Sequence, residues 1–111
     1  MPYDMNLESK ISIILKNINP PKLESKKMFG GVGFMVQGNM ACGVHKDSFI
    51  VRVGPHVYET ALAKPSARQF DITGKPMKGW IKVEPGGFES DQALRKWVEL
   101  GVSFALTLPP K

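Results

Sequence analysis

The apolar residues of the first eighteen positions recur at spacings of three and four. This is the stripe of an amphipathic helix, and it predicts a helix over residues 4–18. The stripe consists of Leu7, Ile11, Ile14, Leu15 and Ile18. The run Asn19-Pro20-Pro21 predicts the end of the helix, because proline lacks the N–H that a further turn needs. We interpret the polar residues up to Lys27 as a connector.

Between residues 28 and 54 the pattern changes to an alternation of apolar residues with small or polar ones. Turn-forming pairs interrupt it at Gly38-Asn39 and Lys46-Asp47, which is typical of hairpins. The pattern predicts a meander with strands near 28–37, 40–45 and 48–54. After it we predict a short helix over 57–63, weaker strands at 67–72 and 80–83, and a final amphipathic helix capped by Ser90 or Asp91.

The register of the meander separates a face of apolar residues from a face of mostly small residues. If Gln37-Gly38-Asn39 forms a three-residue bulged loop, Val36 pairs with Met40. One face then carries Val32, Phe34, Val36, Met40, Cys42, Val44, Phe49, Val51 and Val53. The opposite face is mostly small, and the candidate partner-binding residues on it are Gly31, Gly33, Ala41, Gly43, Ile50 and Arg52. A flat surface of this kind is suited to a partner or a second subunit.

The order of predicted elements is α-β-β-β-α-β-β-α, without the regular strand–helix alternation of a doubly wound parallel sheet. We therefore expect a two-layer α+β fold, with a five-stranded antiparallel sheet and helices packed on one face. The chain has 111 residues, of which 42% are hydrophobic, and this is the size of one domain. We expect residues 1–111 to form it.

The glycine-rich segment MFGGVGF, residues 28–34, is the first place to look for cofactor chemistry. It lacks the Gly-Lys-Ser/Thr of a P-loop, and a predicted strand follows Gly33 where a dinucleotide fingerprint needs a helix. Cys42 and His45 lie three apart on a predicted strand, so their side chains point to opposite faces. We identify no catalytic, cofactor-binding or metal-ligating residues and expect a protein that is not an enzyme. A hydrolase or redox protein that uses Cys42 is the least favoured alternative.

The formal net charge of +5 suggests affinity for anions. A basic stretch forms the candidate nucleic-acid patch: Lys64, Arg68, Lys75, Lys78 and Lys82. Lys22, Lys26 and Lys27 form a second, smaller cluster. We favour the simpler interpretation, solvated lysines that keep a small protein soluble, because no nucleic-acid recognition motif accompanies either cluster.

Several segments together resemble the N-terminal domain of the TfoX/Sxy family. They are MFGGVGF at 28–34, GNMA at 38–41, FIVRV at 49–53, PMKGW at 76–80 and the closing amphipathic helix. The resemblance covers nearly the whole chain. It implies a two-layer α+β fold, in agreement with the element order.

The resemblance also implies a function. TfoX/Sxy proteins regulate natural competence and act with the cyclic-AMP receptor protein at promoters, so a regulatory or interaction module without catalytic activity is expected. The full regulators carry a second, helical domain, and because this sequence ends at Lys111 we expect a stand-alone domain. The expected partner is a protein, by resemblance from the transcription machinery, and direct nucleic-acid binding through the basic stretch is the alternative.

Three further expectations concern membrane association, the cellular compartment and the oligomeric state. The sequence contains no run of apolar residues long enough to span a bilayer and no secretory signal, so we expect no membrane partner. Cys42 is the sole cysteine, which agrees with a reducing compartment, and we expect a cytoplasmic protein. A monomer or a homodimer is expected.

Overall fold

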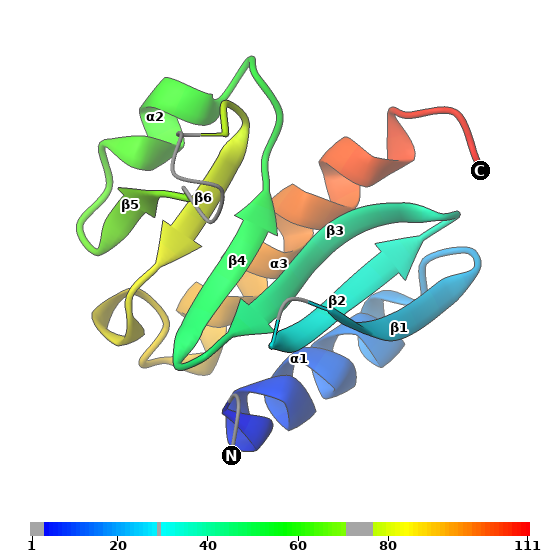
Figure 1. Cartoon of the computed structure of the whole chain (residues 1–111), viewed down its shortest axis with the longest axis horizontal. Coiled ribbons are helices and arrows are strands. Elements are labelled where there is room, and N and C mark those ends of the chain that lie inside the picture. Colours follow the sequence, from blue (N-terminus) through cyan, green and yellow to red (C-terminus); the bar gives the residue numbers. More distant parts are fainter. Residues whose placement is uncertain (1–3, 29, 71–76) are drawn as a thin grey trace.

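The computed structural model describes residues 4–28, 30–70 and 77–111 (Figure 1). The first half holds α1 (Met5–Ile18), β1 (Leu23–Met28), β2 (Gly31–Val36), β3 (Asn39–His45) and β4 (Ser48–Arg52). The second half holds α2 (Tyr58–Leu62), β5 (Ala67–Gln69), β6 (Trp80–Val83), the 3₁₀ turn η1 (Pro85–Gly87) and α3 (Asp91–Leu106). The predicted strand over 67–72 is thus shorter where it is described, and residues 71 and 72 lie outside the described range.

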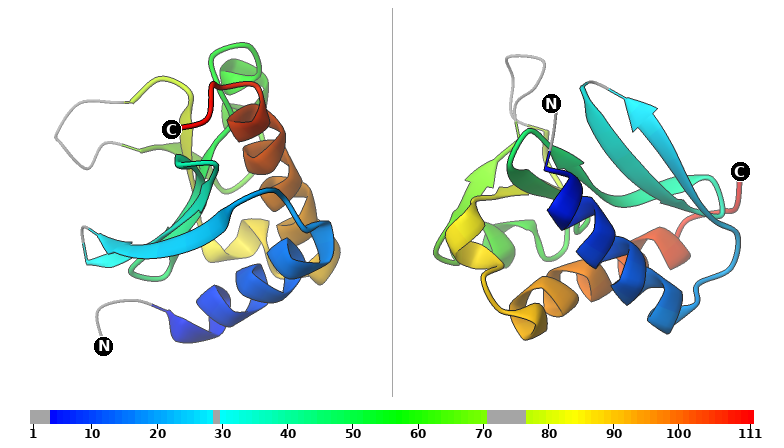
Figure 2. Two further views of the ribbon diagram at one scale, coloured as in Figure 1. Left: turned by 90° about the vertical axis from the view of Figure 1, so that its right-hand side faces the viewer. Right: turned by 90° about the horizontal axis from the view of Figure 1, so that it is seen from below.

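The strands form one antiparallel sheet in the order β1-β2-β3-β4-β6-β5. Figure 2 shows α1 and α3 together on one side of this sheet, while the β1–β2 hairpin projects away from them. The expected α+β class with an antiparallel sheet is confirmed. The expected number of strands is wrong, because the sheet has six strands and not five.

The additional strand is β1, which we had predicted to be a polar connector. Its sequence, LESKKM, has no apolar alternation, and it forms the sheet edge by pairing with β2 from Leu23↔Val36 to Met28↔Gly31. Charged side chains on an edge strand discourage pairing with another chain. The MFGGVGF segment is therefore not one strand. It ends β1, turns with Gly30 at φ +74° and begins β2 at Gly31.

The β2–β3 hairpin corrects a second prediction. Its turn has two residues, Gln37 and Gly38, with φ of +54° and +83°, and Val36 pairs with Asn39. Positive φ at both positions gives the turn twist that suits a two-residue hairpin. The expected bulge lies further along β3, at Ala41, so that Phe34 pairs with Cys42 as predicted. Met40 pairs with Met35 and leaves the apolar face on which we had placed it.

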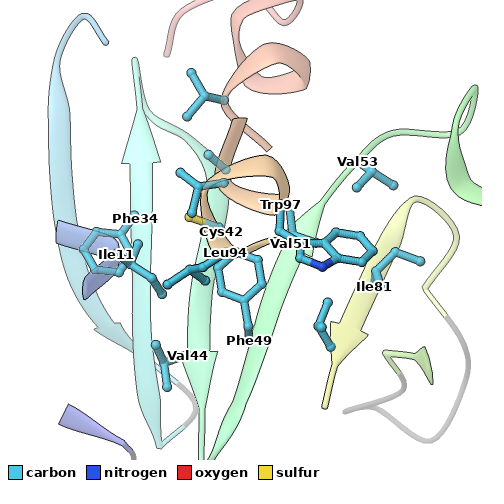
Figure 3. Close-up of a cluster of buried hydrophobic side chains, with 14 of the residues drawn as sticks. Ile11, Phe34, Cys42, Val44, Phe49, Val51, Val53, Ile81, Leu94 and Trp97 are labelled. Carbon is cyan, nitrogen blue, oxygen red and sulfur yellow. The ribbon is translucent and has the colours of Figure 1, made fainter. Parts of the chain in front are cut away.

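The hydrophobic core lies between the sheet and the two long helices (Figure 3). Eight of the nine side chains predicted for the apolar face are buried, all except Met40. Residues of α1 and α3, among them Ile11, Leu94 and Trp97, pack onto them. The Ser90 side chain accepts a hydrogen bond from the Ala93 N–H at 3.1 Å, which confirms it as the cap of α3.

Candidate interaction surface

One face of the sheet is not covered by α1 or α3, and we call it the open face (Figure 2). The strand alternation assigns its residues on β2, β3, β4 and β6, because their neighbours along these strands point into the core. On the edge strands β1 and β5 the cross-strand pairing assigns them. Cross-strand pairing aligns one open-face residue from every strand into a row across the whole sheet. This central row consists of Lys26, Gly33, Gly43, Ile50, Lys82 and Arg68.

Two methionines lie on the open face beside this row. Met35 of β2 and Met40 of β3 are paired and half-buried. A Cβ atom at Gly43 would stand 2.9 Å from the terminal methyl carbon of Met40 and would also meet the Val32 carbonyl. Gly43 thus leaves space for the Met40 side chain. Because methionine is flexible and polarizable, it adapts readily to different apolar surfaces.

An aromatic cluster covers the other side of the open face. The Phe70 ring centroid lies 6.3 Å from that of His45 and 6.1 Å from that of Trp80. His45 belongs to β3 and Trp80 to β6, so the Phe70 ring lies across β4, which runs between these strands. This position accounts for the burial of Ile50, which is only 2% exposed although no described helix covers it.

Arg52 is held at the end of β4 between two aromatic rings. Its guanidinium carbon lies 5.3 Å from the Trp80 centroid and 5.2 Å from the Phe104 centroid. Phe104 comes from α3 and also occupies the space next to Gly54, two residues after the end of β4. Cation–π contacts on both sides fix the orientation of the guanidinium and join the open face to the helical layer.

The six residues predicted for partner binding differ in their accessibility. Gly31, Gly33, Gly43 and Ile50 are buried, and Ala41 is fully buried at the bulge. Arg52 is half-buried. The accessible part of the open face is therefore formed by the methionine pair and by cations. We had counted Lys26 in a basic cluster but had not placed it on this face, because we interpreted β1 as a connector. We had not connected Phe70 or Phe104 with the face, because their contacts are long-range.

The residues predicted for nucleic-acid binding are divided between two sides of the molecule. Arg68 and Lys82 are cross-strand neighbours on the open face. Lys64 instead lines a shallow pocket of about 330 Å³ beside α3, together with Lys96, Glu99, Leu100 and Ser103. Lys78 is exposed in the turn before β6, and Lys75 lies outside the described residues.

The structure confirms that Cys42 and His45 lie on opposite faces of β3. Cys42 is fully buried in the core, and burial raises the pKa of its thiol. Its thiolate is therefore scarce at neutral pH. Across the described residues, no group of three or more His, Cys, Asp or Glu side chains is arranged to hold a metal ion.

We expect the Cys42 thiol to react with a disulfide reagent at least a hundredfold more slowly in the folded protein than in the denatured one, because attack requires an exposed thiolate. Release of the coloured thiolate product, followed over time with and without guanidinium, measures this. Equal rates in the two states would contradict the buried position.

His45 is expected to make stability depend on pH. Burial lowers the pKa of His45, and the charges of Lys46 and Lys82 lower it further. Below the ordinary histidine pKa of about 6.5 the unfolded chain therefore binds the proton more readily than the folded one. The free energy of unfolding should fall as pH decreases from 7.5 to 5.5, and less steeply in His45→Gln. Thermal unfolding of the wild type and of His45→Gln at several pH values checks this, and equal slopes for the two proteins would contradict it.

The fold and this surface define a class: a small two-layer α+β domain whose sheet has one uncovered face rich in cations. A family model described as the TfoX N-terminal domain matches residues 15–105. The chain therefore belongs to the TfoX N-terminal domain family. Comparisons with curated proteins and with solved structures gave no match. Among the described helices, none is both long and apolar enough to cross a membrane.

Proposed function

We propose that the chain is a non-enzymatic regulatory module that binds a protein partner through the open face of its sheet. The observation that supports this most is the pair of half-buried methionines on that face, Met35 and Met40, which neither α1 nor α3 covers. Both described long helices pack on the opposite side, and two exposed cations of this face, Lys26 and Arg68, lie on the strands at its two edges. The regulatory role rests on the resemblance to competence regulators that act through a protein at promoters.

A site-specific photocrosslinker tests the proposed surface. We would place p-benzoylphenylalanine at Met35, on the open face, and in a second variant at Ile13, which is 62% exposed on the outer side of α1. Both variants are expressed in the native host and irradiated. We expect a defined protein adduct from position 35 and none from position 13. Adducts from position 13 alone, or from neither, would refute the proposed surface.

Direct nucleic-acid binding is the second candidate, and the cross-strand pair of Arg68 and Lys82 favours it. Phosphate contacts by this pair would give an affinity for DNA that falls with added salt. If Arg68→Glu and Lys82→Glu abolish salt-sensitive binding of duplex or single-stranded DNA while Lys64→Glu does not, this candidate replaces the first. Absence of DNA binding at low salt removes it.

A further inference from the structure

We infer that the partner segment carries two acidic groups separated by a short apolar centre, and that it lies across the strands along the central row. This inference rests on the proposed function, because it specifies the chemistry of what the open face binds. It follows from the spacing of the cations, the character of the residues between them and the charge balance of the two sides of the domain.

The central row places its cations at the two ends. Lys26 stands on β1, at one edge of the sheet, and Lys82 and Arg68 stand on the two strands at the other edge. The row crosses five strand spacings of about 4.8 Å, which is about 24 Å along the sheet. An extended peptide covers this distance with about seven residues at about 3.3 Å each. Two carboxylate groups that far apart can reach both ends.

The middle of the row has no charge. Gly33, Gly43 and Ile50 occupy it, and the apolar side chains that cover it are Met40 at Gly43 and Phe70 at Ile50, with Met35 beside them. A charged group of the partner would lose hydration here without gaining a counter-ion, whereas an apolar side chain gains contact with the two methionines. The centre of the partner segment is therefore expected to be apolar.

The charge of the open face is not balanced within the described part of the chain. By register it carries four cations, Lys26, Arg52, Arg68 and Lys82, against Glu24 and Glu84. The exposed charges of α3 cancel, because Asp91 and Glu99 stand against Arg95 and Lys96. The excess of positive charge thus lies on the open face and not on α3.

Arg68 and Lys82 carry like charges directly opposite each other, which weakens a sheet. The Arg68 guanidinium donates to the Ala67 carbonyl at 2.9 Å, and Lys82 lies 4.0 Å from the Glu84 carboxylate, at the limit of an ion pair. A partner carboxylate that reached both cations would relieve this repulsion.

Two other occupants fit less well. A second copy docked by two-fold symmetry would bring the same cations against each other. Nucleic acid presents phosphates at even, close spacing, which does not match an uncharged centre. Its bases would also need free aromatic faces, whereas Phe70 is only 9% exposed and one face of Trp80 is covered by Arg52.

Two synthetic peptides of identical composition test the inference. In the split peptide, three glutamates precede and three follow the sequence Leu-Ser-Leu-Ser, so the acidic centres are seven residues apart. In the block peptide all six glutamates precede the same four residues. Fluorescence anisotropy at low salt with the full chain should show the split peptide binding about tenfold more tightly. Lys26→Glu and Arg68→Glu should each weaken its binding about fivefold, since each reverses one cation of the row.

Lys96→Glu is the matched control, because it makes the same charge change on exposed α3. It should leave the preference for the split peptide intact. Circular dichroism verifies the fold of each variant, and the neutral Lys26→Gln provides a milder change at the same position. Equal affinities for the two peptides, an equal effect of Lys96→Glu, or tighter binding of duplex DNA than of the split peptide would overturn the inference.

The photocrosslink at position 35 separates the inference from the proposed function. If it captures a partner while neither peptide binds, the open face is an interaction surface but its ligand is not a segment of this kind. If position 35 captures nothing, the proposed function itself fails.

Discussion

Gly101→Ala is expected to destabilise the domain by about 2 kcal/mol, although alanine is the better helix former. Gly101 lies in α3 where the helix passes over the bulge of β3. A Cβ atom there would overlap the Ala41 carbonyl oxygen and stand 3.0 Å from both the Ala41 carbonyl carbon and a Val51 methyl. Overpacking against the backbone lowers the free energy of unfolding by about 3 kcal/mol, and the higher helix propensity of alanine raises it by about 1 kcal/mol.

Thermal and urea unfolding measure this effect, with a melting temperature about 8 °C lower as the expected result. Ser103→Ala is the control, because Ser103 is exposed on the same helix and its replacement should change stability by less than about 0.5 kcal/mol. If Gly101→Ala raised the melting temperature, helix propensity would outweigh the contact, and α3 would not approach the bulge as closely as the structure shows.

Phe49→Ala is expected to have the largest effect, a loss of about 4 kcal/mol in the free energy of unfolding. Phe49 is fully buried on β4, in the middle of the sheet, and points toward the residues of α3 (Figure 3). Its ring centroid lies 6.4 Å from that of Phe88. Removing a buried phenylalanine ring costs about 3–5 kcal/mol, because the neighbours close the cavity only partly.

Urea unfolding measures the loss in the free energy of unfolding of Phe49→Ala, with the same m-value expected for the variant and the wild type. Phe88→Ala is the matched control, because it removes the other ring of the pair from a half-buried position and should cost clearly less. Equal losses from the two substitutions would mean that the core is centred on the 3₁₀ turn beside α3 and not on β4.

Elements with a strong local pattern could be predicted from the sequence. The α1 stripe, the Ser90 cap of α3 and the limits of β6 all agree with the structure. β1 could not be predicted, because LESKKM gains its strand conformation from pairing with β2 and buries little of its own. We expected a bulge but placed it in the hairpin loop Gln37-Gly38-Asn39. Its position at Ala41 coincides with the close approach of Gly101, a contact between residues sixty positions apart.

The candidate surface was predictable only in part. Alternation along β2, β3 and β4 was sufficient to place Gly33, Gly43 and Ile50 on one face. The ends of the central row could not be predicted in this way. The position of Lys26 depends on the additional strand β1, and the position of Lys82 depends on the pairing of β6 with β4. The environment of Arg52 could not be predicted either, because Phe104 reaches it from the last helix.

The sequence by itself determined the class of the fold, the two long helices, the separation of the sheet into an apolar and a small-residue face, and the family resemblance. These properties follow from local periodicity and from short segments, which a linear chain displays directly. The tertiary structure alone decided the strand order, the position of the bulge, and the alignment of cations from β1, β6 and β5 around an uncharged centre. Such an alignment depends on hydrogen-bond register between distant strands, and no local pattern encodes which strands become neighbours.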